Sequence, residues 1–336
     1  MGDSPYKVRT DRIGSVEVVV LADASHKAEA WVAPLSGFNC FHFEHEWNGQ
    51  KIELLFPTDS EEELMLGGTG FGYPQLFPFP NRVKGGKYSV RGKDYQVDPN
   101  HHGINHIHGL VIDREFKNVE SGVDDEQGAF VRGSIVPDDY PDHFVRQFPF
   151  PFRFTLTYSL KDGALTVDTL VENTGDNVLP FGYGTHPYFP IPILPGGRRQ
   201  DCEILIPANQ SWVLDESIPT GERLPVEGRL DARSFRALGD ETYDDVMTDI
   251  IKNEDGGSSC VIRDPHAGLQ IRIWADAGYR EWVVYAPEGR DLVAFEPYTC
   301  ATDAVNLQAR GLDAGWQEIE PGASWSGRQR VSLEAC

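Results

Sequence analysis

The sequence predicts an all-β fold, a large antiparallel β-sandwich. Its 336 residues include 34 glycines and 23 prolines, 11% of residues are aromatic, and no long stretch has helical periodicity. This composition is typical of many short strands joined by turns. Since parallel strands need long crossover connections, a succession of short strands without intervening helices favours antiparallel sheets. Because strands of one type flank the Pro/Gly-rich residues 190–199, we expect residues 1–336 to form a single domain.

The individual strands are predicted from alternation and from turn residues. The clearest hairpin joins residues 152–160 to residues 165–171 through Asp162-Gly163, a pair typical of tight turns. Residues 137–147 are a candidate short helix. Further extended segments are predicted at residues 16–21, 41–45, 51–56, 87–90, 94–97, 178–184, 202–206, 269–274, 282–285 and 292–295, with a short turn at residues 91–93.

Charge and composition restrict the partners and the compartment. The net charge of −22 argues against nucleic acid and anionic membranes, which would be repelled, whereas a neutral small molecule would not. The five cysteines are odd in number and never form a C-x-x-C pair, which suggests reduced thiols. The first residues lack a signal-peptide core, and no apolar run approaches the ~20 residues of a membrane span. We therefore expect a soluble cytoplasmic protein, either a monomer or a homodimer.

The segment from residue 67 to residue 109 has the features of a binding site. Its glycines and Pro-Phe-Pro run exclude a helix, and Asn81 and Arg82 follow on a turn. A guanidinium offers a fork of donors that suits paired hydroxyls or a carboxylate. Taken alone, Arg82 is better explained as a surface arginine beside a capped turn, so its interpretation as a ligand depends on the rest of the chain.

Three segments place an ionisable residue at a predicted strand end, at His108, His186 and Glu296. A proline follows both His186 and Glu296, which biases each residue to an extended backbone and fixes the direction of its side chain. After an apolar strand, a glutamate is partly desolvated, which raises its pKa and improves it as a base. The alternatives are a solvated strand-end glutamate and a buried histidine bonded to a carbonyl.

Other residues could contact a ligand. Tyr188 belongs to a group of rings around His186 that suits the flat face of a sugar, and Asp244 and Asp245 could accept hydrogen bonds from hydroxyls. His106 and His108 form a His-x-His pair, which in metal-binding barrels of the cupin type is soon followed by a carboxylate. No carboxylate follows at that spacing here, so we expect no metal and no cofactor.

In their order along the chain, these motifs resemble the aldose 1-epimerase (galactose mutarotase) family. The resemblance spans about residues 67 to 322 and rests on Pro-Phe-Pro-Asn81-Arg82, Gly92-Lys93-x-Tyr95, Ile107-His108-Gly109, His186-Pro187-Tyr188-Phe189, Tyr243-Asp244-Asp245, Glu296-Pro297-Tyr298-Thr299 with Asn306, and Pro321-Gly322. It implies a mutarotase-type β-sandwich with an open cleft. Leu110 stands where many members have a second glycine, and the adjacent Asp244 and Asp245 leave open which aspartate binds substrate.

The resemblance implies that the chain interconverts the α and β anomers of a free hexose. It further implies His186 as the general acid, Glu296 as the general base, and Arg82, His108 and Asp244 as ligands of sugar hydroxyls, beside which Asn81 and Tyr188 are expected to bind substrate. An unperturbed histidine is largely neutral at pH 7, so we expect Glu296 or Asp244 to favour its charged form.

Three alternatives remain open at this point: a hexose-6-phosphate 1-epimerase, a non-catalytic carbohydrate-binding protein, and a metal-dependent sandwich enzyme. A binding module would need no opposed acid and base, so the presence of both favours catalysis. A phosphate would need a cationic pocket, for which the candidates are Arg82, Lys84, Lys87 and Arg91. If the lysines instead lie on the outer face of the hairpin, the site favours a neutral hexose.

Overall fold

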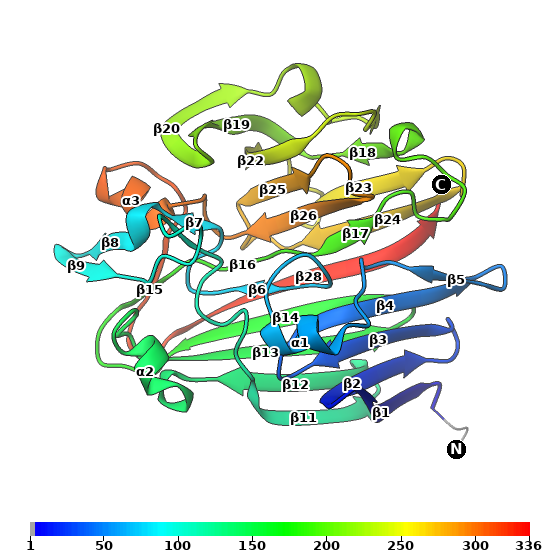
Figure 1. Cartoon of the computed structure of the whole chain (residues 1–336), viewed down its shortest axis with the longest axis horizontal. Coiled ribbons are helices and arrows are strands. Elements are labelled where there is room, and N and C mark those ends of the chain that lie inside the picture. The colour runs from blue at the N-terminus through cyan, green and yellow to red at the C-terminus, as the bar shows by residue number, and fades with distance from the viewer. Residues whose placement is uncertain (1–3) are drawn as a thin grey trace.

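The structure, a computed structural model, describes residues 4–336. Three sheets hold most of the chain, and Figure 1 shows the five-stranded and eight-stranded sheets together lying over the nine-stranded sheet. Every pair of named strands within the described residues is antiparallel. The predicted antiparallel β-sandwich is therefore confirmed.

The smallest of the three sheets is a simple meander, whereas the two larger sheets combine strands from distant parts of the chain. The five-stranded sheet runs β1 (Tyr6–Ile13), β2 (Val16–Asp23), β3 (Ala28–Ala33), β4 (Asn39–Trp47) and β5 (Gln50–Glu53). The nine-stranded sheet runs β11 (Lys117–Asp124), β12 (Gly128–Ile135), β13 (Phe152–Lys161), β14 (Ala164–Asn173), β28 (Ser324–Ala335), β24 (Leu269–Ala275), β23 (Ser258–Asp264), β18 (Glu203–Leu205) and β21 (Arg236–Ala237). The eight-stranded sheet runs β20 (Ile218–Pro225), β19 (Ala208–Asp215), β22 (Tyr243–Ile250), β25 (Glu281–Ala286), β26 (Leu292–Tyr298), β16 (Gly184–Thr185) and β6 (Gln75–Leu76), with β17 (Tyr188–Pro190) also paired to β26.

Short elements complete the fold. The two-stranded ladders are β7 (Arg82–Val83) with β10 (His106–Ile107), β8 (Lys87–Val90) with β9 (Lys93–Gln96), and β15 (Leu179–Phe181) with β27 (Gln317–Ile319). The α-helices are α1 (Glu61–Leu66), α2 (Pro141–Phe144) and α3 (Ala304–Ala309). None of the helices in residues 4–336 is long and apolar enough to cross a membrane.

The predicted hairpin of β13 and β14 lies inside the nine-stranded sheet, between β12 and the central strand β28. Asp162 and Gly163 both have positive φ, at 51° and 71°, which is the conformation that a tight turn between twisted strands requires. Alternate residues of β13, among them Phe154, Leu156 and Tyr158, are fully buried. Because side chains alternate between the faces of a strand, these residues form one wall of the core.

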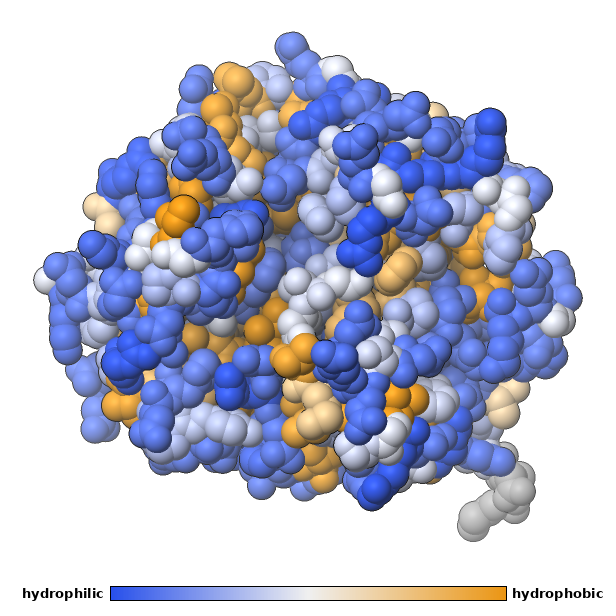
Figure 2. Space-filling model, viewed as in Figure 1, coloured by the Kyte–Doolittle hydropathy of each residue, from blue (hydrophilic) through white to orange (hydrophobic). Residues whose placement is uncertain are grey.

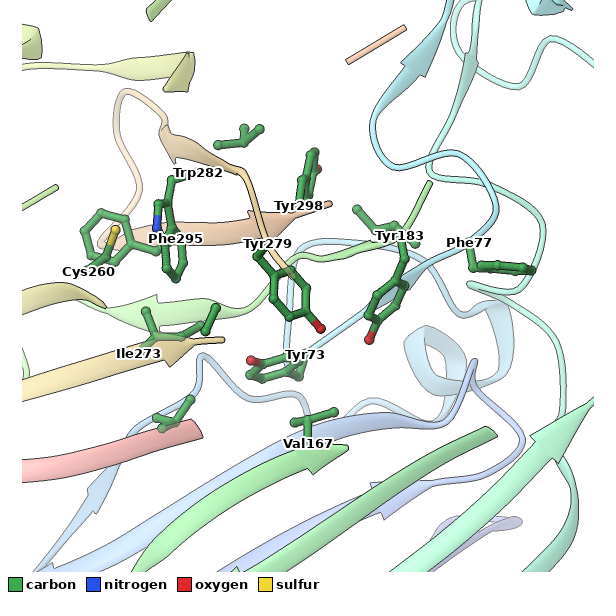
Figure 3. Packing of buried hydrophobic residues seen from close by; sticks show 14 of the residues in the cluster. Tyr73, Phe77, Val167, Tyr183, Cys260, Ile273, Tyr279, Trp282, Phe295 and Tyr298 are labelled. Carbon is green, nitrogen blue, oxygen red and sulfur yellow. The ribbon is translucent and has the colours of Figure 1, made fainter. Parts of the chain in front are cut away.

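The core lies between the sheets. Figure 3 shows Tyr73, Tyr183 and Tyr279 between the strands that carry Trp282 and Phe295 and the strand that carries Val167. On the outside, Figure 2 shows a mostly hydrophilic face with scattered hydrophobic patches, in agreement with the high charge of the chain.

Three predicted elements differ from the structure. The segment predicted at residues 178–184 is divided into β15 and β16, which belong to different sheets. Residues 137–147 form a 3₁₀ turn (Pro137–Asp139) and the separate helix α2, because Tyr140, with φ −144° and ψ 62°, precedes a proline and cannot continue a helix. The strand predicted at residues 51–56 ends at Glu53. The amide of Leu54 still donates to the carbonyl of Phe43 in β4, but the amide of Phe56 donates to the carbonyl of Tyr188 instead.

Candidate active site

Three neighbouring strands of the eight-stranded sheet direct polar side chains to one face. Asp244 of β22 lies opposite Tyr285 of β25, Tyr285 lies opposite Ala294 of β26, and Glu296 stands two residues beyond Ala294. Since directly opposed residues share a face and residues two apart in a strand do as well, Asp244, Tyr285 and Glu296 point to the same side. Strand register thus brings together residues more than 50 positions apart in sequence.

The prediction that Glu296 ends its strand is wrong. β26 continues through Pro297, which lies opposite Trp282, to Tyr298. On its other side β26 pairs with β17 up to Ala294 and with β16 at Tyr298, so Pro297 falls in a gap of that ladder, where its missing N–H costs no strand hydrogen bond.

His186 lies in the chain that spans this gap and faces Glu296. The distance between His186 Nε2 and Glu296 Oε1 is 3.3 Å, and the two residues are only 6% and 1% exposed. The ring of Tyr188 stacks on the His186 imidazole with centroids 4.3 Å apart, and its hydroxyl lies 3.1 Å from Nε2. Tyr188 is itself 2% exposed. Tyr188 thus packs its ring on the imidazole and places its hydroxyl beside Nε2.

Burial changes the proton affinity of both members of the pair. It raises the pKa of Glu296 well above its usual range, an effect partly offset by a hydrogen bond from Tyr298. It lowers the pKa of His186, and the positive charge of Arg82 adds to this lowering. The expectation that a neighbouring carboxylate keeps His186 charged is therefore wrong in direction, because desolvation penalises a charged imidazole. Because one pKa rises and the other falls, the Glu296 carboxyl competes with the His186 imidazole for a proton.

Arg82 and Asp244 lie beside the pair. Arg82 Nη2 is 4.0 Å from Asp244 Oδ2, and the Arg82 side chain is 14% exposed. Arg82 Nη1 donates to Asn81 Oδ1 at 3.0 Å, and Asn81 is only 5% exposed. In this structure Asn81 therefore holds the guanidinium of Arg82.

The two adjacent aspartates have different partners. Asp245 is held by both guanidinium nitrogens of Arg229, at 2.6 and 2.9 Å. Asp244 instead accepts from the Ser217 hydroxyl at 3.1 Å and faces Arg82. Because alternation turns neighbouring residues of β22 to opposite faces, only Asp244 can point toward the His186 side of the sheet.

His108 joins the site from the β7 and β10 ladder. Its imidazole packs edge-on against that of His186 with centroids 5.4 Å apart, and its Nδ1 is buried without a hydrogen-bond partner among the described residues. Burial, with the nearby His186 and Arg82, lowers the His108 pKa well below its usual range. The next residue, Gly109, has φ 72°, and a Cβ there would lie 2.3 Å from the Phe77 carbonyl oxygen, so only glycine fits this turn.

His106, in the same segment, is held away from the site. His106 bonds to the carbonyl oxygens of Asp98 and Gly109, which is a structural role. Residues 4–336 contain no group of three or more His, Cys, Asp or Glu side chains arranged to hold a metal ion.

Sequence reasoning missed two tyrosines. The hydroxyl of Tyr298 donates to Glu296 Oε2 at 2.5 Å, and Tyr285 lies edge-on to His186 with centroids 6.0 Å apart. Tyr298 could have been found from the sequence, because it stands two residues after Glu296. If the strand continues through both residues, their side chains lie on the same face. For Tyr285 the signal was strand register, which the sequence alone does not provide.

Comparisons with known proteins identify the family and the fold. The family model described as aldose 1-epimerase matches residues 44–332. The chain belongs to the aldose 1-epimerase family. Among its relatives in this family, the uncharacterized protein YihR of Escherichia coli K12 is 27% identical over 263 residues, which cover 76% of this chain and 78% of that protein.

Solved structures show that this aldose 1-epimerase family member has the fold of the galactose mutarotases. A galactose mutarotase-like protein from Clostridium acetobutylicum superposes with a TM-score of 0.86 at 21% identity, covering 99% of each chain. A galactose 1-epimerase from Lactobacillus acidophilus gives a TM-score of 0.73 at 15% identity, covering 98% of each chain. At these identities the similarity establishes the architecture and not the substrate.

Proposed function

We propose that this protein is an aldose 1-epimerase that interconverts the α and β anomers of a free hexose, such as glucose or galactose. The observation that carries the proposal is the direct approach of His186 Nε2 to Glu296 Oε1, 3.3 Å apart, beside Arg82 and Asp244. The hydroxyl oxygen and the ring oxygen of a cyclic sugar are both attached to C1. An acid and a base that serve these two oxygens must therefore lie close together, as this pair does.

The chemistry needs only proton transfer. Glu296 removes the proton of the C1 hydroxyl while His186 protonates the ring oxygen, so the bond from C1 to the ring oxygen breaks and C1 becomes an aldehyde. Rotation about the bond between C1 and C2 presents the other face of the aldehyde. The two protons then return in reverse, and the ring closes as the opposite anomer with both residues restored.

The surroundings favour a neutral sugar. Arg91 is engaged by Glu318 at 2.7 Å, and the side chains of Lys84 and Lys87 are exposed. This arrangement matches lysines on the outer face of the hairpin, and it leaves Arg82 beside the carboxylates of Asp244 and Glu296. A site with one arginine among carboxylates suits hydroxyl groups better than a phosphate dianion.

A polarimetric assay distinguishes the substrates. We expect kcat/KM for free glucose or galactose to exceed that for the corresponding 6-phosphates at both low and high salt. A strong preference for the phosphate that weakens as salt rises would instead assign the protein as a hexose-6-phosphate 1-epimerase, since screening reduces attraction between a charged substrate and its site.

Substituting Arg82 with Ala should mainly weaken substrate binding. Removing its hydrogen bonds to sugar hydroxyls should lower kcat/KM by about 10- to 100-fold, mostly through KM. The matched control is Arg91→Ala, which removes an exposed arginine bound to Glu318 and should leave both constants unchanged. Equal losses in the two variants would show that Arg82 does not bind the substrate.

The shared proton predicts an unusual pH dependence. With unperturbed pKa values of about 4.3 for Glu and about 6.5 for His, activity would fall above about pH 6.5 as the acid lost its proton. Here burial raises the pKa of Glu296 and lowers that of His186, so the last proton to leave the pair is held by Glu296, and it leaves at a pH above the usual range of a glutamate. We expect a broad plateau in kcat/KM that continues above pH 6.5, with loss at high pH when that proton leaves. A fall with a midpoint near 6.5 would contradict the shared proton.

A further inference from the structure

The base Glu296 accepts a hydrogen bond from a buried tyrosine. Tyr298 is 0% exposed, and its hydroxyl donates to Glu296 Oε2 at 2.5 Å. The other carboxyl oxygen, Oε1, faces His186 Nε2 at 3.3 Å. One oxygen of the base is thus bound by the core of the protein, and the other is directed to the acid.

A glycine in the neighbouring strand makes room for the Tyr298 ring. Tyr298 lies opposite Gly184 of β16, and a Cβ at position 184 would be 2.2 Å from Cδ1 of the tyrosine ring. Only glycine therefore allows the ring to lie flat against the neighbouring strand beneath Glu296. The position of the Tyr298 ring therefore depends on the absence of a side chain at position 184.

Asn81 lies between Tyr298 and Arg82. Its side chain offsets part of the rise in the Tyr298 pKa, and its Oδ1 accepts from Arg82 Nη1 at 3.0 Å. Asn81 is itself buried, at 5% exposed. The surroundings of the Tyr298 hydroxyl thus include Glu296 and a residue that also holds Arg82.

We propose that Tyr298 is a positioning residue for the epimerase reaction, holding Glu296 as a carboxylate with Oε1 turned toward His186. The inference rests on the proposed function and adds to it the residue that orients the base. Tyr298 acts through Glu296 and does not contact the substrate, since it is fully buried.

The hydroxyl has a defined electrostatic effect. Hydrogen bonding to the charged form lowers the pKa of Glu296 against the larger effect of burial. Without this donor the shared proton would move from His186 to Glu296, and the form with a charged base and a charged acid would become rarer. The total number of protons on the pair would be unchanged over the plateau, so the rate should fall at every pH there.

The test is Tyr298→Phe, which removes one oxygen atom from a buried ring. We expect kcat to fall about 10- to 100-fold, the loss of one hydrogen bond to a charged group, while KM stays near that of the wild type. The alkaline limb of the pH profile should move to higher pH, because the Glu296 pKa rises. A merely structural defect would not move this limb.

Tyr279→Phe is the matched control. Tyr279 is also buried in the core, at 1% exposed, and Figure 3 shows its hydroxyl pointing toward the layer that holds Val167. We expect this variant to retain the kcat and the pH profile of the wild type. A Tyr298→Phe enzyme with wild-type kcat and pH profile, or equal losses in both variants, would overturn the proposal.

A measurement without substrate separates this inference from the proposed function. The ¹⁵N resonances of His186 report the protonation of the pair, and in Tyr298→Phe the alkaline titration should move to higher pH. Inactivity of the wild type on every aldose would refute the proposed function, whereas an unchanged titration would refute the role of Tyr298. If Tyr298→Phe does not fold, incorporation of 3-fluorotyrosine at position 298 should shift the titration to lower pH, since a more acidic phenol is a stronger donor; no shift would again refute the role.

Discussion

Replacing Glu296 with Gln should reduce anomer exchange by about 10²- to 10⁴-fold, the range expected for loss of a general base. The amide has the shape of the carboxyl and can still accept the hydrogen bond from Tyr298, but it cannot take the proton of the C1 hydroxyl. Since a neutral amide is also less costly to bury than a carboxylate, the fold should be retained. The readout is kcat by polarimetry, together with the melting temperature.

Glu281 supplies a matched control on the same face of the sheet. It lies opposite Tyr298, is 2% exposed, and accepts hydrogen bonds from Thr248 and Trp212. Burial raises the pKa of Glu281 to about 8, yet this carboxyl does not contact His186 in the described residues. Glu281→Gln should therefore retain most activity. Turnover near that of the wild type in Glu296→Gln, or an equal loss in Glu281→Gln, would refute the assignment of the base.

Replacing His186 with Asn should cause a loss of similar size. The amide can occupy part of the space beside Tyr188, but it cannot donate a proton to the ring oxygen of the sugar. We expect kcat to fall about 10²- to 10⁴-fold with a smaller change in KM. His102→Asn, a substitution at an exposed histidine of the same histidine-rich segment as His108, serves as the control and should have little effect.

The double variant tests whether the two residues act as a unit. Groups that share one proton and serve one transition state are strongly non-additive. The variant with both Glu296→Gln and His186→Asn should therefore be hardly slower than either single variant. Losses that multiply would indicate that the two side chains act independently, contrary to the 3.3 Å contact between them.

The elements that depend on local patterns were predictable from the sequence. Alternation and the Asp162-Gly163 turn identified β13 and β14, and the motifs around His186 and Glu296 identified the members of the pair. The continuation of β26 was not predictable, because it depends on a gap between β16 and β17 that accommodates Pro297. Sequence patterns indicate the backbone conformation that a residue prefers. The continuation of β26 depends instead on where the neighbouring strands β16 and β17 end.

The environment of each site residue was harder to predict than its identity. The sequence suggested that Tyr188 contacts the sugar, but its ring lies against His186 at 2% exposed. It left Asp244 and Asp245 equivalent until strand register separated them, with Asp245 bound to Arg229. The direction of the His186 pKa shift followed from burial, which no local motif encodes.

The most direct test of the proposed activity is to measure anomer exchange by the wild-type protein. Magnetisation exchange between the α and β C1 protons of glucose or galactose, recorded by NMR with Glu296→Gln as the reference, isolates the enzymatic rate from the spontaneous one. We expect rapid exchange with the wild type and only the spontaneous rate with the variant. Exchange at the same rate in both samples would contradict an acid–base mechanism built on His186 and Glu296.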